Sequence, residues 1–158
     1  MNASYVHSYL KDGSVFVLAN EWAKPLPDEL YIEGAIDLVI NGTRLLGFED
    51  WDLVDQLWAY LLDGLFSVFQ SGKPFEIFFP DQPLKLQLSR VTEHRINFSV
   101  GNHSANVSAT SLLFVLAQGG QDFIKEITRL APSSSASWNP YVDKCAVLLE
   151  IAYAMDSR

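Results

Sequence analysis

Residues 49–65 read EDWDLVDQLWAYLLDGL, and the place of this stretch between two groups of strands decides the fold. Its apolar side chains recur at helical spacing, which predicts a helix over about residues 50–70. The stripe consists of Trp51, Val54, Trp58, Leu61, Leu65 and Val68. Further apolar residues leave only a narrow polar edge. We therefore expect this helix to be sandwiched between the core and another element, or partly covered by a second protein.

The residues before this helix have the pattern of antiparallel strands. We expect strands over residues 5–10, 14–22, 29–40 and 43–46. In ELYIEGAIDLVI (Glu29–Ile40) apolar residues alternate with Glu29, Glu33 and Asp37, which predicts a half-buried strand with an acidic outer face. Asn41-Gly42 predicts a two-residue hairpin turn with positive φ.

Strands resume after the helix, and two helices close the chain. We expect strands over residues 75–80, 84–91, 95–101 and about 104–107, then helices over about 110–130 and 140–155. Gly119-Gly120 predicts a break in the first of these helices. Asn139 is the expected N-cap of the second, with Pro140 at its first position. This order predicts an α+β fold: an antiparallel sheet of about seven or eight strands with three helices packed on one face, in a single domain over residues 1–158.

Charge is distributed unevenly along the chain. The net charge is −8. Residues 1–63 hold 11 acids and 3 bases, whereas residues 64–158 hold 8 of each, so the whole imbalance lies in the first part. An acidic field repels nucleic acid and anionic lipid and attracts basic partners. We therefore expect neither nucleic acid nor a membrane among the partners.

The expected compartment is the cytoplasm. The N-terminus has neither the basic region nor the long apolar region of a secretory signal, and no apolar run is long enough to span a membrane. The single cysteine, Cys145, excludes an internal disulfide and lies on an apolar helical face, where we expect a buried, inert thiol.

Catalytic and metal-binding patterns are absent from the sequence. Asp52 and Asp63 would be separated by about 16 Å along the predicted helix, too far for a general acid–base pair. The histidines, His7, His94 and His103, are scattered without a metal-ligand spacing. No phosphate-binding glycine loop or nucleophile elbow occurs. We expect no enzymatic activity, no catalytic residue, no metal and no cofactor.

Three segments together resemble a known class of protein. EGAIDLVINGTRLL, EDWDLVDQLWAYLLDGL and FFPDQPLKL, in this order, resemble small acidic bacterial proteins that look like immunity proteins of polymorphic toxin and contact-dependent inhibition systems. The resemblance covers Glu33 to about Leu86, a third of the chain. It implies a non-enzymatic cytosolic protein that binds and blocks a cognate toxin domain, with no shared catalytic residues to transfer.

The acidic residues of the strand and the helix are then the predicted contact surface for a basic toxin. This set comprises Glu29, Glu33, Asp37, Asp52, Asp55 and Asp63, with Trp51 as an aromatic anchor. Two alternatives remain open. One is a homo-oligomeric subunit, such as a homodimer, and the other is an enzyme whose pocket combines His94 or His103 with a carboxylate.

Overall fold

The computed structural model describes residues 2–158 and confirms the α+β class. Within these residues nine strands form two antiparallel sheets, accompanied by three α-helices. The strands are β1 (Tyr5–Asp12), β2 (Val15–Leu18), β3 (Glu33–Ile40), β4 (Thr43–Leu46), β5 (Asp52–Leu53), β6 (Phe75–Phe78), β7 (Lys85–Arg90), β8 (Arg95–Val100) and β9 (His103–Ser108). The helices are α1 (Val54–Gln70), α2 (Ala109–Leu130) and α3 (Ser135–Asp156). Short 3-10 turns, η1 (Ala19–Glu21), η2 (Phe48–Asp50) and η3 (Pro132–Ser134), complete the chain.

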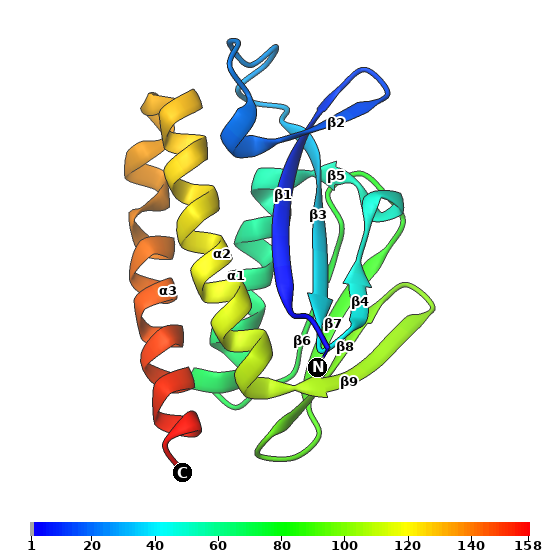
Figure 1. Cartoon of the computed structure of the whole chain (residues 1–158), viewed down its shortest axis with the longest axis vertical. Coiled ribbons are helices and arrows are strands. Elements are labelled where there is room, and N and C mark those ends of the chain that lie inside the picture. Colours follow the sequence, from blue (N-terminus) through cyan, green and yellow to red (C-terminus); the bar gives the residue numbers. More distant parts are fainter. Residues whose placement is uncertain (1) are drawn as a thin grey trace.

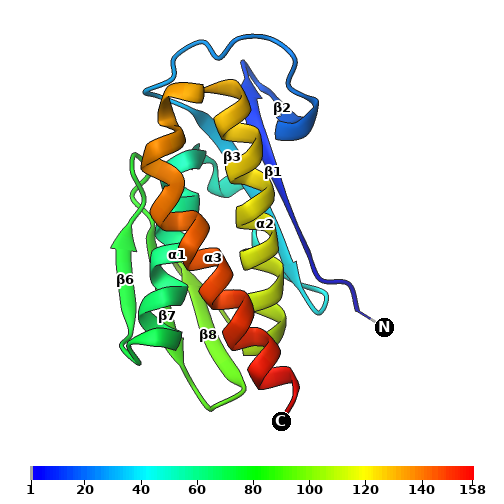
Figure 2. The same cartoon turned by 90° about the vertical axis from the view of Figure 1, so that its left-hand side faces the viewer.

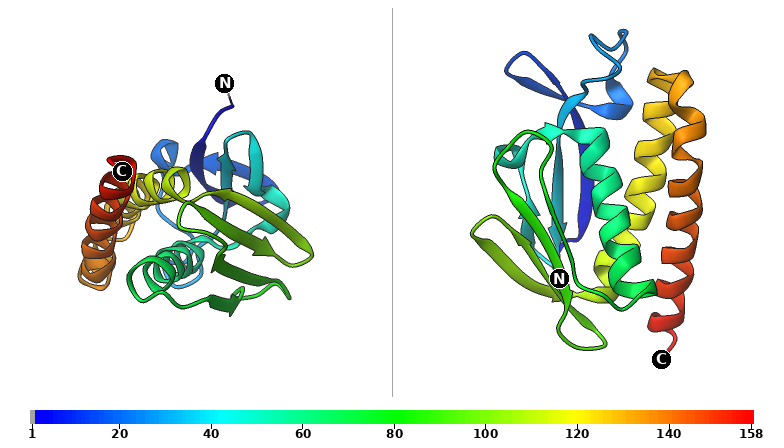
Figure 3. Two further views of the ribbon diagram at one scale, coloured as in Figure 1. Left: turned by 90° about the horizontal axis from the view of Figure 1, so that it is seen from below. Right: turned by 180° about the vertical axis from the view of Figure 1, so that it is seen from behind.

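The strands before α1 and the strands after it form two separate sheets. The first sheet has the order β2-β1-β3-β4. Strand β5 pairs with the first residues of β3, on the same side of β3 where β4 pairs with its last residues. The strands after α1 pair with one another, in the order β6-β7-β8-β9. The two sheets meet where β4 contacts β8 and β9. Figure 3 shows the sheets converging on the side away from the helices.

All three helices lie on one side of the sheets (Figure 1). Helix α2 packs against β1, α1 packs against β6 and β7, and α3 packs on α1 and α2 as the outermost layer (Figure 2). Helix α1 is thus sandwiched between the sheets and α3, which accounts for its wide apolar surface. At its centre Trp58 is fully buried, stacks on Phe123 at 5.8 Å, and donates its indole N–H to Ser8 Oγ at 2.8 Å. One continuous core joins both sheets and all three helices.

The Asn41-Gly42 turn is confirmed, because both residues have positive φ, at 48° and 81°. Helix α1, by contrast, starts later than predicted. Asp52 and Leu53 are extended and pair with Gly34 and Glu33 of β3, so the helix begins only at Val54. The acidic residues before it belong to η2 and β5 and not to a helical first turn.

Two strand boundaries in the first sheet also differ from the prediction. The second strand ends at Leu18, where η1 begins, and β3 starts at Glu33 and not at Glu29. The predicted acidic outer face of β3 is wrong at Asp37, which is 8% exposed. Arg44 from β4 covers this carboxylate, with Nε at 2.9 Å from Oδ1.

The glycine pair in α2 does not break the helix. A Cβ at Gly119 would lie 2.2 Å from Val6 Cγ1, and one at Gly120 would lie 3.0 Å from Cys145 Sγ. The two glycines therefore let α2 approach β1 on one side and α3 on the other. Cys145 is fully buried, as predicted, and burial raises the pKa of its thiol to about 11.

Helix α3 begins five residues before Pro140, so Asn139 is not its N-cap. The buried Trp138 anchors the extra turn against the core through an edge-to-face contact with Phe123 at 5.9 Å. Pro140 is the sixth residue of the helix, where it lacks the N–H that would bond to the Ala136 carbonyl, so the helix continues through it without that hydrogen bond.

Candidate functional site

The loop between η1 and β3, residues 22–32, projects beyond the end of the first sheet. Its ends are anchored in the core, since Trp22 is 3% exposed and Ile32 is 6% exposed. Between them Leu30 is 90% exposed and Tyr31 is 47% exposed. Leu30 and the adjacent Tyr31 together form an exposed apolar patch rimmed by acidic residues, an arrangement typical of an interaction site.

The tip of this loop is an ordered turn. The Asp28 carboxylate accepts the N–H of Leu30 at 2.9 Å, and the Asp28 carbonyl accepts the N–H of Tyr31 at 3.2 Å. Asp28 therefore closes the turn with both its side chain and its backbone. Pro25 and Pro27 restrict the chain that leads into it. Leu30 is consequently held outward by local structure.

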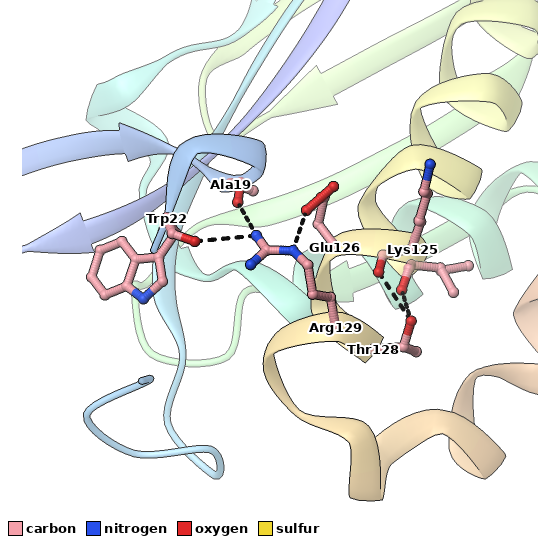
Figure 4. Close-up of polar contacts among 7 residues, drawn as sticks. Ala19, Trp22, Lys125, Glu126, Thr128 and Arg129 are labelled. Carbon is pink, nitrogen blue, oxygen red and sulfur yellow. Dashed lines mark hydrogen bonds and ion pairs between the residues drawn. The ribbon is translucent and has the colours of Figure 1, made fainter. Parts of the chain in front are cut away.

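Helix α2 holds the start of the loop (Figure 4). One Arg129 nitrogen, Nη2, donates to the carbonyl oxygens of Ala19 and Trp22, each at 3.2 Å. The same guanidinium is oriented by Glu126, which accepts from Nε at 2.9 Å. Arg129 thus links the last turns of α2 to a segment about 107 residues earlier in the chain.

Asp52, at the start of β5, ties the first sheet to the β6–β7 corner. This carboxylate is 1% exposed and accepts the backbone N–H groups of Asp81 and Gln82, at 3.1 and 2.8 Å. The Gln82 amide donates in turn to the Trp51 carbonyl. Asp52 is therefore an internal brace between the two sheets and cannot contact a partner, which corrects its prediction as a surface residue.

Tyr31 joins the loop to this corner. Its hydroxyl donates to the Asp81 carboxylate, and this bond, with Glu33 and Asp52 adding to the negative field, raises the pKa of Tyr31 to about 12. The loop tip, the start of β3 and the β6–β7 corner therefore share one surface. We call it the acidic end surface; it comprises Asp28, Glu29, Leu30, Tyr31, Glu33, Trp51 and Asp81.

Three of the predicted contact residues, Glu29, Glu33 and Trp51, belong to the acidic end surface. Trp51 is half-buried, and the Lys11 ammonium lies 4.6 Å from its ring centroid. Among the residues that the structure describes, Leu30 is the most exposed large hydrophobic residue. Phe48, three residues before Trp51, and Phe78, three before Asp81, are also exposed, at 42% and 63%. The sequence marked the segment before Leu30 only as a proline-rich interruption between strands.

The other predicted contact residues lie elsewhere. Asp37 is covered by Arg44. Asp63 binds Lys144 Nζ at 2.5 Å and the Tyr141 hydroxyl at 3.1 Å, so it joins α1 to α3. Burial and this carboxylate raise the pKa of Tyr141 to about 12. Asp55 lies in a separate hollow between the same two helices. These residues are dispersed, and the predicted set does not form one face.

The histidines give little support to an enzymatic pocket. His103 shares a hollow of about 350 Å³ with Arg44, Glu49 and Asp50, where burial raises the pKa of Asp50. Yet across residues 2–158 no histidine side chain forms a hydrogen bond or ion pair with a carboxylate. The same residues contain no group of three or more His, Cys, Asp and Glu side chains that could hold a metal ion.

Comparison with known proteins gives no relative, since no protein family model, no curated protein and no solved structure matches this chain. In the part of the chain that the structure describes, no helix is both long enough and apolar enough to cross a bilayer.

Proposed function

We propose that this protein is a non-enzymatic binding protein, of the immunity type, that neutralises a basic toxin domain through the acidic end surface. The observation that carries the proposal is an exposed leucine and tyrosine set among Asp28, Glu29, Glu33 and Asp81 on a braced loop. Acidic residues speed the encounter with a basic partner, and a central apolar anchor holds the complex once formed.

Preorganisation favours this surface over the rest of the acidic residues. Arg129 fixes the start of the loop, Asp28 its tip, and the Tyr31–Asp81 bond its end. A loop that is already ordered loses little conformational entropy when it binds. The ion-paired acids Asp37 and Asp63 lack this advantage, because a partner would first have to displace Arg44 or Lys144.

A homo-oligomeric subunit remains a weaker alternative. The wide apolar surface of α1, which had suggested it, is covered by the sheets and by α3. Sedimentation of the purified chain tests this directly.

The first experiment is a pull-down with the tagged protein from lysate of the source organism, washed at low and at high salt. A stoichiometric basic protein that is retained at low salt is then purified and its toxic activity assayed with and without this chain. The proposal predicts neutralisation, and retention without any effect on toxicity contradicts it.

The surface is tested with a double charge reversal, Glu29→Lys with Glu33→Lys. Association with the identified partner should slow by roughly tenfold or more at low salt and become less salt-dependent. The matched control is Asp143→Lys with Glu150→Lys, which makes the same change of net charge on the exposed face of α3. Equal slowing in both variants would mean that only the net charge of the protein affects association. No slowing in the Glu29/Glu33 variant would exclude the acidic end surface as the contact surface.

A further inference from the structure

A hollow of about 230 Å³ lies between the N-terminal turns of α1 and α3. Asp55 and Gln56 of α1 line it together with Ser134, Ser137, Trp138 and Tyr141 from η3 and α3. These residues come from segments about 80 positions apart in sequence, so the hollow exists only in the folded chain.

The Asp55 carboxylate in this hollow has no counter-charge. Its Oδ1 atom is buried and accepts no hydrogen bond, and within residues 2–158 no basic side chain forms an ion pair with it. Lys144, which lies against the Tyr141 ring, is bound to Asp63. Burial raises the pKa of Asp55 even though the N–H groups of Asp55 and Gln56 at the helix N-terminus lower it. The helix terminus therefore compensates this charge incompletely.

The hydroxyl groups around the hollow can only accept further hydrogen bonds. Ser134 Oγ donates its single hydrogen to the Ala131 carbonyl at 2.7 Å, and Ser137 Oγ donates to the Ser134 carbonyl at 2.6 Å. The Tyr141 hydroxyl is likewise committed to Asp63. A ligand that fits these groups must bring hydrogen-bond donors.

Two aromatic rings complete the wall. The Trp138 and Tyr141 centroids lie 5.5 Å apart, with the ring planes inclined at 60°. Trp138 is 7% exposed, so its ring is fixed by packing. Aromatic faces attract cations, and they do so more strongly where water is partly excluded.

We propose that this hollow binds a primary ammonium group. Such a group supplies three donors to the Asp55 carboxylate and the serine oxygens, and its positive charge and alkyl chain match the carboxylate and the rings. The ammonium can belong to a free small amine or to a lysine side chain of another protein. This inference does not depend on the toxin-binding proposal, because no residue of the hollow belongs to the acidic end surface.

The test is a titration of the folded protein with n-butylammonium chloride, followed through the Trp138 indole N–H resonance, which Trp138→Phe identifies. Sodium chloride at equal ionic strength and n-butanol are the ligand controls. We expect a saturable shift with n-butylammonium alone. An equal shift with n-butanol would overturn the proposal, since it would show apolar partitioning without recognition of the charge.

Asp55→Asn, which keeps the shape of the side chain, should weaken n-butylammonium binding by roughly tenfold or more. Asp143→Asn removes an exposed acid of α3 and should leave the affinity unchanged. Ser137→Ala, at an exposed position, should weaken it by a smaller factor and serves if Asp55→Asn does not fold. Unchanged binding in Ser137→Ala and in a folded Asp55→Asn would overturn the site.

The source of the ammonium is distinguished with a second probe, Nα-acetyl-lysine N-methylamide. Tighter binding of this probe than of n-butylammonium supports a lysine within a protein chain. Equal or weaker binding supports a free amine. Absence of saturable binding by either probe would refute the inference.

Discussion

At the scale of single residues, burial separates acids that brace the fold from acids that a partner can reach. Asp52 and Glu33 are close in the structure and both were predicted as contact residues. Only Glu33 has its side chain partly open to solvent, whereas Asp52 is 1% exposed and saturated by backbone N–H groups. The sequence predicted Glu33 on a strand over residues 29–40 and Asp52 on a helix over about residues 50–70, and it contains no sign of the β6–β7 corner that covers Asp52.

Replacing Asp52 should therefore act on stability. Asp52→Ala leaves the N–H groups of Asp81 and Gln82 without their acceptor, and we expect a loss of about 2–4 kcal/mol in the free energy of unfolding. Urea denaturation measures it. The control, Asp143→Ala on the exposed face of α3, should change stability by less than about 0.5 kcal/mol. A similarly small change for Asp52→Ala would show that the Asp52 carboxylate does not stabilise the β6–β7 corner.

Replacing Asp55 should change stability in the opposite direction to replacing Asp52. Burial raises its pKa in the folded state, so the folded protein favours the neutral form, and ionisation at neutral pH lowers stability. Asp55→Asn should therefore be more stable than the parent at pH 7. Its advantage should shrink as the pH falls through the raised folded-state pKa and vanish below the unfolded-state pKa of about 3.9, where the parent carboxyl is neutral in both states. Thermal unfolding at several pH values gives the comparison; a parent that is the more stable at pH 7 contradicts it.

At the scale of elements, local patterns predicted the kind of each segment better than its ends. The Asn41-Gly42 hairpin and the period-two strands β7 and β8 follow from short-range chemistry. The start of β3 does not, because Leu30 continues the apolar alternation although it faces solvent. The start of α3 was hidden by Pro140, since the buried Trp138 stabilises helical turns ahead of it.

The α2 glycines supply a test at this scale. Alanine at Gly119 would favour the helix by up to about 1 kcal/mol, but its Cβ would lie 2.2 Å from Val6 Cγ1 and 3.0 Å from Trp58. We expect the steric cost to prevail and Gly119→Ala to lose about 1–3 kcal/mol of stability. Gln118→Ala, at the exposed neighbouring position, should be neutral or slightly stabilising. A more stable Gly119→Ala would mean that α2 can shift away from β1.

At the scale of the whole molecule, the division into two sheets was not predictable from the sequence. Period-two patterns show which strands exist, but pairing partners depend on contacts far apart in the chain. Here β4 and β5 together complete one side of β3, and the strands after α1 pair with one another in a second sheet. The acidic end surface arises from the same long-range arrangement, since its members come from both sides of α1.

The continuous core predicts that the two sheets unfold together. Ile36→Ala removes a buried side chain from β3 in the first sheet, and Leu88→Ala removes one from β7 in the second. Each substitution should lower the free energy of unfolding by about 2–5 kcal/mol. Both substitutions should shift one common unfolding transition to lower urea concentration. Far-UV and near-UV circular dichroism should then report the same transition. Two separated transitions would show that the sheets belong to separate folding units.

The Asn41-Gly42 turn has a consequence for the chemical lifetime of the protein. Asparagine followed by glycine is prone to deamidation, because the glycine nitrogen attacks the asparagine side-chain carbonyl and closes a succinimide ring. In the folded chain the Gly42 N–H is donated to the Ala3 carbonyl at 2.7 Å, and Asn41 Oδ1 accepts from Ser4 Oγ at 3.1 Å. The N-terminal segment thus holds both reacting groups in place, which protects Asn41 from succinimide formation and deamidation for as long as the chain stays folded.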